Sequence, residues 1–344
     1  MLSFKPIVAI TMGDAAGIGP EIIVKALSQE EIYDLCKPLV IGDAKVIKSA
    51  VNFSHLKLKV TSILDIRECK FETGEIDVLD LKNIDFDNLV MGKPNPMCGK
   101  AAIDYIRKAV ELTLRGKTHA ISTAPINKKA VNMAGYKFTG HTEFIAELTK
   151  TADYAMMLIA GKLKVSHVTT HMSLREACKF VRKERILKVI ELTHKALKDM
   201  GINNPKIAVA ALNPHSGEGG LFGKEENEEI LPAVEEAVNR GIVSIGPLPA
   251  DTVFVKASGG AYDAVVAMYH DQGHIPVKMV GLRWDKDRKE WSRVSGVNLT
   301  LGLPIIRTSV DHGTAYGKAG KGRANPDSMI EAIRLAAKLA SQKS

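Results

Sequence analysis

The sequence predicts an α/β fold built on a mainly parallel sheet, and three features of the chain indicate it. Apolar runs alternate with segments of helical periodicity from end to end, as in proteins whose helices connect parallel strands. Several runs have the length of a buried strand, among them residues 208–212 and 264–267. A histidine follows closely after each of these two runs. Parallel α/β proteins place their binding and catalytic residues at such strand ends.

The elements at the two ends of the chain are the easiest to predict. Residues 7–11 form the first expected strand, and Pro20 suits the start of the next helix because its missing N–H would have no partner there. Residues 185–200 place apolar side chains on one face only, which predicts a surface helix. Asn325 can cap a last helix that runs to about residue 340. Residues 284–293 are charged, contain two tryptophans and lack periodicity, so we expect a loop or a hairpin insertion there.

The composition limits the class of protein. A chain of 344 residues with 45% hydrophobic residues can bury a real core, in one large domain or two. The formal charge of +8 is spread along the chain, so it is either a lysine-rich solvated surface or a basic groove for anionic small molecules. No nucleic-acid-binding motif accompanies it, and we expect no nucleic-acid partner.

Cysteine usage and the N-terminus predict a cytoplasmic location. The four cysteines are widely separated, with no pair at metal or redox spacing, which indicates free thiols in a reducing compartment: Cys36, Cys69, Cys98 and Cys178. The apolar run after Lys5 ends by Gly13, which is too short for a signal peptide or a membrane span. We therefore expect no membrane partner.

Three histidines lie at the ends of three separate short segments and predict a divalent-metal site: His171, His215 and His270. A single histidine near a strand end is more often a hydrogen-bonded structural residue, so the hypothesis depends on three occurring together beside small or acidic residues. Neutral imidazoles suit zinc, cobalt, nickel or manganese more than calcium, and three ligands leave positions open for a substrate oxygen. Asp251 and Asp271 are candidates for supporting or acid/base groups.

Other segments could bind an anion. The glycine-rich turn at residues 13–21 could hold one at a helix start, although a tight turn that needs positive φ explains its glycines equally well. Its spacing is neither that of a Rossmann site nor that of a P-loop. Residues 140–143 and Lys278 could grip a phosphate or simply be solvated. Arg307 lies in an apolar segment, where a cation needs an anionic partner, and a phosphorylated substrate would supply one.

Taken together, the chain from about Pro6 to Ala340 resembles the 4-hydroxythreonine-4-phosphate dehydrogenase family of vitamin B6 biosynthesis, with its paralogues that act on 4-phosphorylated threonate or erythronate. The resemblance rests on six ordered motifs: Thr11-Met12-Gly13-Asp14 with Gly17-Ile18-Gly19-Pro20-Glu21, Phe138-Thr139-Gly140-His141-Thr142-Glu143, Leu212-Asn213-Pro214-His215, Pro247-Leu248-Pro249-Ala250-Asp251-Thr252, Met268-Tyr269-His270-Asp271-Gln272-Gly273, and Thr308-Ser309-Val310-Asp311-His312-Gly313-Thr314-Ala315. Two departures concern the loops: Ala15 stands where the family usually has proline, and residues 284–293 form a longer stretch than in typical biosynthetic members. Residues 273–278 look more like the phospho-threonate branch.

The resemblance implies a fold and a set of roles. The fold would be that of isocitrate and isopropylmalate dehydrogenases, with two α/β domains flanking a cleft, here residues 1–135 with 315–344 and residues 136–314. His171, His215 and His270 would bind the metal, with His270 contributed across a homodimer interface. The substrate would be bound by His141, Thr142, Lys278, Asn298 and Arg307, and Asp251 or Lys278 would manage its protons. The cofactor would lie at an adenosine-binding loop that contains Gly313, Thr314, Ala315 and Asn325.

The implied activity is metal-dependent oxidation and decarboxylation of a 4-phosphorylated 3-hydroxy C4 acid by NAD or NADP, with zinc, magnesium, cobalt or manganese as the metal. We expect 4-phosphohydroxy-L-threonine as the substrate, giving 3-amino-2-oxopropyl phosphate for pyridoxal phosphate biosynthesis. The alternative is 4-phospho-D-threonate or 4-phospho-D-erythronate, giving dihydroxyacetone phosphate. Two rivals from other classes are a phosphate acyltransferase, against which the three histidines argue, and a metabolite-binding protein without activity. Lys318 could meet the 2′-phosphate of NADP or be solvated, and the resemblance favours NAD.

Overall fold

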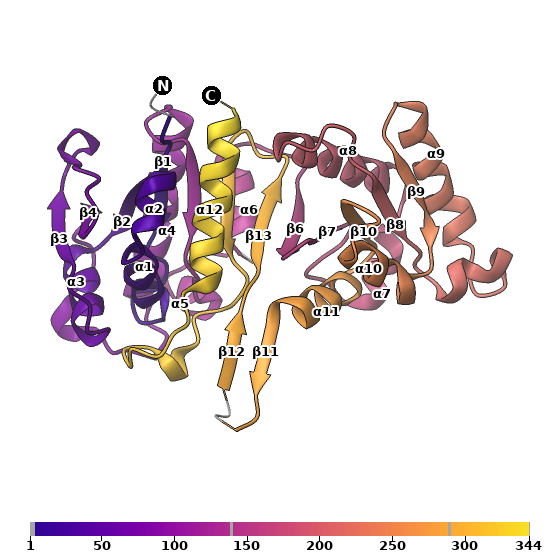
Figure 1. Cartoon of the computed structure of the whole chain (residues 1–344). Coiled ribbons are helices and arrows are strands. Elements are labelled where there is room, and N and C mark those ends of the chain that lie inside the picture. Colours follow the sequence, from indigo (N-terminus) through magenta and orange to yellow (C-terminus); the bar gives the residue numbers. More distant parts are fainter. Residues whose placement is uncertain (1–3, 138–139, 288–289, 344) are drawn as a thin grey trace. The chain divides into compact units, whose positions relative to one another are not determined.

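The computed structural model describes residues 4–137, 140–287 and 290–343. Contacts within the chain divide it into two compact units, Met1–Ala152 with Leu303–Ser344, and Asp153–Gly302. The sequence predicts the limits near residues 135 and 314, whereas the contacts place them after Ala152 and Gly302. Both units are α/β, so the predicted fold class is confirmed (Figure 1).

The first unit is built on a fully parallel set of six strands in the order β3-β4-β2-β1-β5-β14. Their bounds are β1 Ile7–Thr11, β2 Lys37–Gly42, β3 Lys59–Ile63, β4 Glu75–Asp80, β5 Ala120–Thr123 and β14 Ile306–Val310. The central strands are buried almost throughout, as expected for a parallel sheet with helices on both faces. The predicted first strand is confirmed residue for residue.

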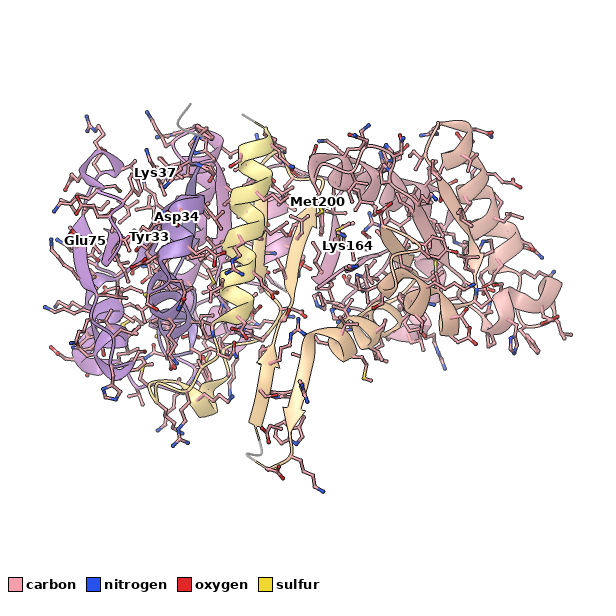
Figure 2. The ribbon with its side chains drawn as sticks, in the orientation of Figure 1. Tyr33, Asp34, Lys37, Glu75, Lys164 and Met200 are labelled. Atoms are coloured by element: carbon pink, nitrogen blue, oxygen red, sulfur yellow. The ribbon has the colours of Figure 1, made fainter. Side chains whose placement is uncertain are left out.

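Helices cover the sheet of the first unit: α1 Gly19–Leu27, α2 Glu30–Leu35, α3 Ala44–Phe53, α4 Pro96–Leu114, α5 Lys128–Met133, α6 His141–Leu148 and α12 Asp327–Gln342. Pro20 lies in the first turn of α1, as predicted. Asn325 also acts as predicted, because its side-chain oxygen accepts a hydrogen bond from the Asp327 N–H at 2.8 Å where α12 begins. The buried Tyr33 hydroxyl ties α2 to β4 by donating to the backbone oxygen of Glu75 at 2.9 Å (Figure 2).

The second unit holds six strands in the order β13-β6-β7-β10-β8-β9. Their bounds are β6 Ala155–Ala160, β7 Leu163–His167, β8 Ile207–Ala210, β9 Ser244–Leu248, β10 Ala264–Ala267 and β13 Val297–Leu301. The pairs β13–β6 and β6–β7 are antiparallel, and the pairs β7–β10, β10–β8 and β8–β9 are parallel. The sheet is therefore parallel on the side that carries the three predicted histidines.

The helices of the second unit are α7 Leu174–Phe180, α8 Lys183–Asp199, α9 Leu231–Asn239, α10 Ala250–Ser258 and α11 His270–Gly281. One core cluster joins the strands to α10 and α11 through buried apolar side chains such as Val165, Ala208, Phe254, Val265 and Val277. The amphipathic pattern at residues 185–200 corresponds to α8, whose apolar face is buried. The expected helix is thus confirmed.

The charged stretch at residues 284–293 forms a hairpin of its own. Strands β11 Leu282–Asp285 and β12 Glu290–Val294 pair antiparallel as a separate two-stranded sheet (Figure 1). Trp284 and Trp291 pack edge to face with ring centroids 5.2 Å apart, although both stay about half exposed. Arg288 and Lys289 lie outside the described residues. In the described part of the chain, no helix combines the length and the apolar character needed to cross a membrane.

Candidate active site

The topology of the second unit brings the three predicted histidine segments to one edge of its sheet. Strands β7, β10 and β8 are neighbours and run parallel, so their carboxyl ends lie at the same edge. His171 follows β7, His270 follows β10 as the first residue of α11, and His215 follows β8. Parallel α/β proteins bind ligands at this edge. The predicted placement of His215 and His270 at strand ends is therefore confirmed, and His171 also follows a strand of this edge.

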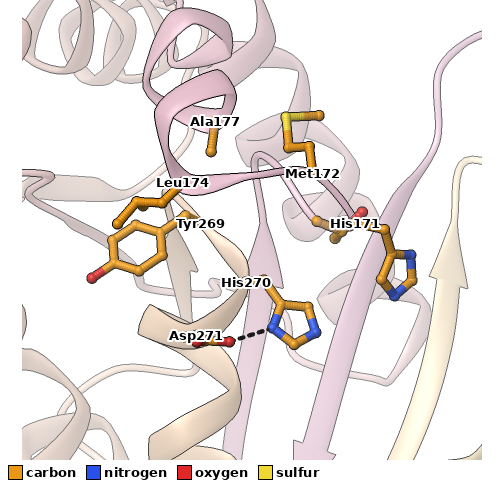
Figure 3. A pocket seen from close by; sticks show the side chains of 8 residues that line it. His171, Met172, Leu174, Ala177, Tyr269, His270 and Asp271 are labelled. Atoms are coloured by element: carbon orange, nitrogen blue, oxygen red, sulfur yellow. Dashed lines mark hydrogen bonds and ion pairs between the residues drawn. The ribbon is translucent and has the colours of Figure 1, made fainter.

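His171 and His270 lie together. Their ring centroids are 5.8 Å apart, and both line a pocket of about 450 Å³ with Met172, Leu174 and Tyr269 (Figure 3). The Nδ1 atom of His270 is 2.6 Å from Oδ1 of Asp271. A carboxylate oxygen can only accept, so His270 donates from Nδ1 and keeps the lone pair of Nε2 for a ligand.

This donor set fits a borderline metal ion. Two imidazoles side by side, one with its tautomer fixed by a carboxylate, match the way zinc and its neighbours are bound in proteins. Among the residues that the structure describes, no three His, Cys, Asp or Glu side chains are grouped so that they could hold one ion. His215 is therefore not grouped with the pair in this way, and its role as third ligand stays a prediction.

His215 belongs to an unusual turn. Residues 215–220 all have positive φ, with values of 52° for His215, 56° for Ser216 and 44° for Glu218. Left-handed backbone costs a residue with a Cβ roughly 1–2 kcal/mol, and such strain concentrates at functional sites. The His215 ring is exposed and lies 6.4 Å, between centroids, from the ring of Phe222. The surrounding structure must therefore hold this turn in place.

Two further histidines, His274 and His167, pack next to the His171–His270 pair. The His274 ring stacks on His270 with centroids 3.6 Å apart, and its Nδ1 atom is 2.9 Å from the His270 backbone oxygen. The ring of His167, which is fully buried, lies 4.8 Å from that of His274. A side chain on Gly273 would clash with His167, so only glycine lets α11 pack this closely. Sequence reasoning missed both roles, although His274 follows His270 at the i,i+4 spacing of helix neighbours.

Burial keeps both supporting histidines neutral. It lowers the pKa of His167 to about 3, helped by the neighbouring His274. It lowers the pKa of His274 to about 4, helped by His270. The backbone oxygen of Met156 lies 3.3 Å from Nδ1 of His167 and fixes its tautomer, because a carbonyl can only accept.

The depressed pKa of His167 predicts acid sensitivity. The unfolded chain protonates this imidazole near pH 6.5, whereas the folded protein resists protonation down to about pH 3. The stabilisation is thus fully present above pH 6.5 and is lost as pH falls toward 3. His167→Asn should remove a slope of about 1.4 kcal/mol per pH unit in the unfolding free energy between pH 6 and 4. Urea unfolding at several pH values tests this, and parallel curves for the two proteins would contradict it.

The first unit contains a separate cationic group, the arginine group, made of Arg307, Thr123 and Thr142. Arg307 lies on β14 and is 2% exposed. Its guanidinium donates to Thr123 Oγ1 at 2.7 Å and to Thr142 Oγ1 at 3.4 Å. Burial lowers the pKa of Arg307 to about 9, and the charge of Glu143 acts in the opposite direction. The sequence predicts an anionic partner for Arg307, and Glu143 supplies part of that charge.

His141 begins α6 in the same unit, next to Thr142. Its Nε2 atom is buried, and within the described residues it has no hydrogen-bond partner. Burial holds the pKa of His141 well below its usual value, and the Arg307 charge adds to this. Phe138 and Thr139 of the same motif lie outside the described residues. A buried imidazole beside a guanidinium and two hydroxyls suits a phosphate.

The other expected substrate residues lie in the second unit. Asn298 lies on β13, donates to the sulfur of Met156 at 3.0 Å and has a buried Oδ1 atom without a partner in the described part of the chain. Lys278 lies on α11 and is partly buried. Asp251 is exposed at the start of α10 and lines a pocket of about 620 Å³ that Asp271 also reaches. The roles of these residues stay predictions.

The expected cofactor loop is anchored in the first unit. The Ile18 N–H donates to the Thr314 backbone oxygen at 3.1 Å, and Ala315 adopts a left-handed conformation with φ of 41°. The Tyr316 hydroxyl donates to Oδ2 of the buried Asp14 at 2.6 Å. Burial raises the pKa of Asp14. The glycine-rich turn at residues 13–19 thus supports residues 314–316. This favours the explanation that its glycines serve a tight turn over the explanation that they bind an anion. Gly313 is exposed beside this loop.

The α/β fold is shared with solved dehydrogenases, and the chain is an enzyme of this class. It matches over 98% of both chains, with a TM-score of 0.82 and 46% identity, the crystal structure of a 4-hydroxythreonine-4-phosphate dehydrogenase from Burkholderia phymatum. Residues 34–336 match the family model described as pyridoxal phosphate biosynthetic protein PdxA. The chain belongs to this family, and the resemblance found in its sequence is confirmed.

Two curated relatives cover the chain almost completely. A protein of Cupriavidus necator named D-threonate 4-phosphate dehydrogenase is 48% identical over 344 residues, 100% of both chains. A protein of Oceanobacillus iheyensis, provisionally given the same name, is 49% identical over 346 residues, covering 99% of this chain and 100% of the relative. These names support the phospho-threonate branch that residues 273–278 indicate.

Proposed function

We propose that the chain is a metal-dependent, NAD-linked dehydrogenase that oxidises and decarboxylates D-threonate 4-phosphate. The single observation that carries the proposal is the His171–His270 pair. Its ring centroids are 5.8 Å apart, and Asp271 sets the tautomer of His270. Near-complete coverage of two relatives with this activity in their names supports the choice of substrate. The products would be dihydroxyacetone phosphate, carbon dioxide and the reduced nicotinamide.

The arginine group would bind the phosphate. A planar guanidinium and two hydroxyls can form several charge-assisted hydrogen bonds to phosphate oxygens, and Nε2 of His141 offers one more contact. The phosphate would compete with Glu143 for the Arg307 charge. Binding energy from the phosphate, which does not react, would thus contribute to holding the substrate.

His171, His215 and His270 would hold the divalent metal ion. A bound cation there would polarise the hydroxyl and carboxylate oxygens of the substrate, which assists both hydride loss and decarboxylation. Asp271 would keep the His270 lone pair directed outward, and the stacked His274 would hold the ring in place. Lys278 or Asp251 would move the hydroxyl proton. Residues 313–315 and Asn325 would hold the adenosine part of the nicotinamide cofactor, which supplies the hydride acceptor when bound.

The chain would act as a homodimer whose interface includes α11, the helix that begins with His270. The family resemblance supports this, and so do exposed apolar side chains on the same helix: Ile275 is 61% exposed and Met279 is 79% exposed. The hairpin β11–β12, a two-stranded sheet with exposed Trp284 and Trp291, is also suited to packing against another chain. A monomer at assay concentration in light scattering would contradict this proposal.

The second candidate substrate is 4-phosphohydroxy-L-threonine, which the name of the similar protein from Burkholderia phymatum favours. The two acids differ at C2, where one carries a hydroxyl and the other an ammonium group. We expect the metal-loaded enzyme to form NADH from D-threonate 4-phosphate with the higher kcat/KM when both are offered in parallel assays. A higher kcat/KM for the amino acid would reverse the assignment, and no NADH from either would refute both.

A further inference from the structure

The loop that carries His215 is closed around one buried carboxylate. Glu226 is 2% exposed and begins the short π-helical turn Glu226–Ile230. Its Oε1 atom accepts hydrogen bonds from the backbone N–H groups of Leu212, at 2.9 Å, and Asn213, at 2.7 Å. Its Oε2 atom accepts from the Asn213 side-chain amide at 2.9 Å. Glu226 therefore fixes the backbone two residues before His215.

The same carboxylate touches the middle of the left-handed turn. A Cβ placed on Gly217, which has φ of 79°, would lie 2.7 Å from Oε2 of Glu226. The Asn213 amide also reaches Oε2 of Glu225 at 2.8 Å, so one side chain bridges both glutamates. A side chain on Gly223 would clash with this amide. Glycines at 217 and 223 thus let the loop close on the Glu226–Asn213 pair.

These contacts account for a conformation that the local sequence disfavours. His215, Ser216 and Glu218 have left-handed backbone, which needs support from outside the turn. Ser216 contributes a single long hydrogen bond of 3.4 Å to the Pro247 backbone oxygen. Glu226 contributes three shorter ones, made in a buried setting where hydrogen bonds to a charged group are strong.

We propose that Glu226, through Asn213, is a positioning residue for His215: it holds the left-handed turn from which this imidazole would bind the metal. The inference rests on the proposed function, because it takes His215 as a metal ligand. Glu226 itself need not touch the metal or the substrate. Glu226 would hold His215 in place before the ion binds, so that metal binding would not include the entropic cost of ordering the loop.

Glu226→Gln is the direct test, because it keeps the size of the side chain but replaces one acceptor by a donor that faces the Asn213 amide. Affinity for Co²⁺, measured by visible absorption and by competition with a chelator, should fall by about 10–100-fold. Hydrogen exchange of residues 212–220 in the metal-free protein should become faster. Asn213→Ala, which removes the bridge from the other side, should have the same two effects.

Glu229→Gln is the matched control. Glu229 lies on the same π-helical turn and, like Glu226, accepts from a backbone N–H, but its partners are the Lys183 N–H, at 2.7 Å, and the Arg182 guanidinium, at 2.6 Å. Its loss should lower stability and leave Co²⁺ affinity unchanged. His215→Ala in the same assay tests the proposed function separately. If His215 is a metal ligand, this variant should bind Co²⁺ more weakly whether or not Glu226 positions it.

The outcomes separate the two claims. If His215→Ala binds Co²⁺ as the wild type does, the proposed metal set is wrong. If His215→Ala loses affinity but folded Glu226→Gln keeps it, the positioning role is wrong, and Glu226 is a purely structural residue. If Glu226→Gln does not fold, Asn213→Ala decides in the same way.

Discussion

Arg307→Lys should raise the KM for the phosphorylated substrate by about 30-fold or more while the protein stays folded. Lysine keeps the charge but cannot reproduce the planar guanidinium that reaches Thr123 and Thr142 together. Truncating one member of a buried, hydrogen-bonded charge pair costs about 2–5 kcal/mol, which is about 30-fold to several thousand-fold in binding. Steady-state kinetics over a wide range of substrate concentrations measures the effect.

The control for this prediction is Arg240→Lys. Arg240 forms surface ion pairs with Glu191 and Glu236, which contribute little, and its replacement should leave KM unchanged. The dephosphorylated acid is a second control: Arg307→Lys should hardly change its turnover, because it has no phosphate to lose. Equal loss on both substrates would show that Arg307 stabilises the fold and does not bind phosphate.

His171→Ala should reduce metal-dependent turnover by about a thousand-fold, since the metal contribution is worth several kcal/mol and one of its ligands is removed. The variant should also bind zinc more weakly, as measured by metal analysis after dialysis. His55→Ala, an exposed histidine of the other unit, is the control and should retain wild-type turnover. Full activity of His171→Ala would overturn the metal assignment.

The same variant distinguishes two ways of pairing the histidines. His171 and His270 are neighbours within one chain, while the family resemblance implies that His270 serves the partner subunit. If His270 is exchanged, mixing His171→Ala with His270→Ala subunits restores one complete ligand set in each mixed dimer, and activity returns. If both act within one chain, the mixture stays inactive.

Strands and their ends could be predicted because their signals are local. Residues 7–11 and 264–267 are uninterrupted apolar runs, and a buried parallel strand requires little else. The segments of His215 and His270 follow such runs, so their place at strand ends could be derived from the chain alone. The antiparallel pairing of β6 and β7 was not predicted, although the two-residue link Gly161-Lys162 between them is too short for a crossover and favours a hairpin.

The supporting residues could not be found because their partners are distant in sequence. Thr123 meets Arg307 across 184 positions, and Glu226 reaches Asn213 only because a left-handed turn folds back on it. Glu226 also carries no motif of its own. A sequence pattern reports burial and periodicity, whereas hydrogen bonds between loops depend on the complete fold.

The measurement that tests the proposed function most directly is the amount of carbon dioxide released per NADH formed from D-threonate 4-phosphate by the metal-loaded enzyme. We expect equal amounts, both lost when the metal is removed with a chelator and both restored by zinc or manganese. NADH without carbon dioxide would show a simple dehydrogenase, and turnover that survives metal removal would contradict the role given to His171, His215 and His270.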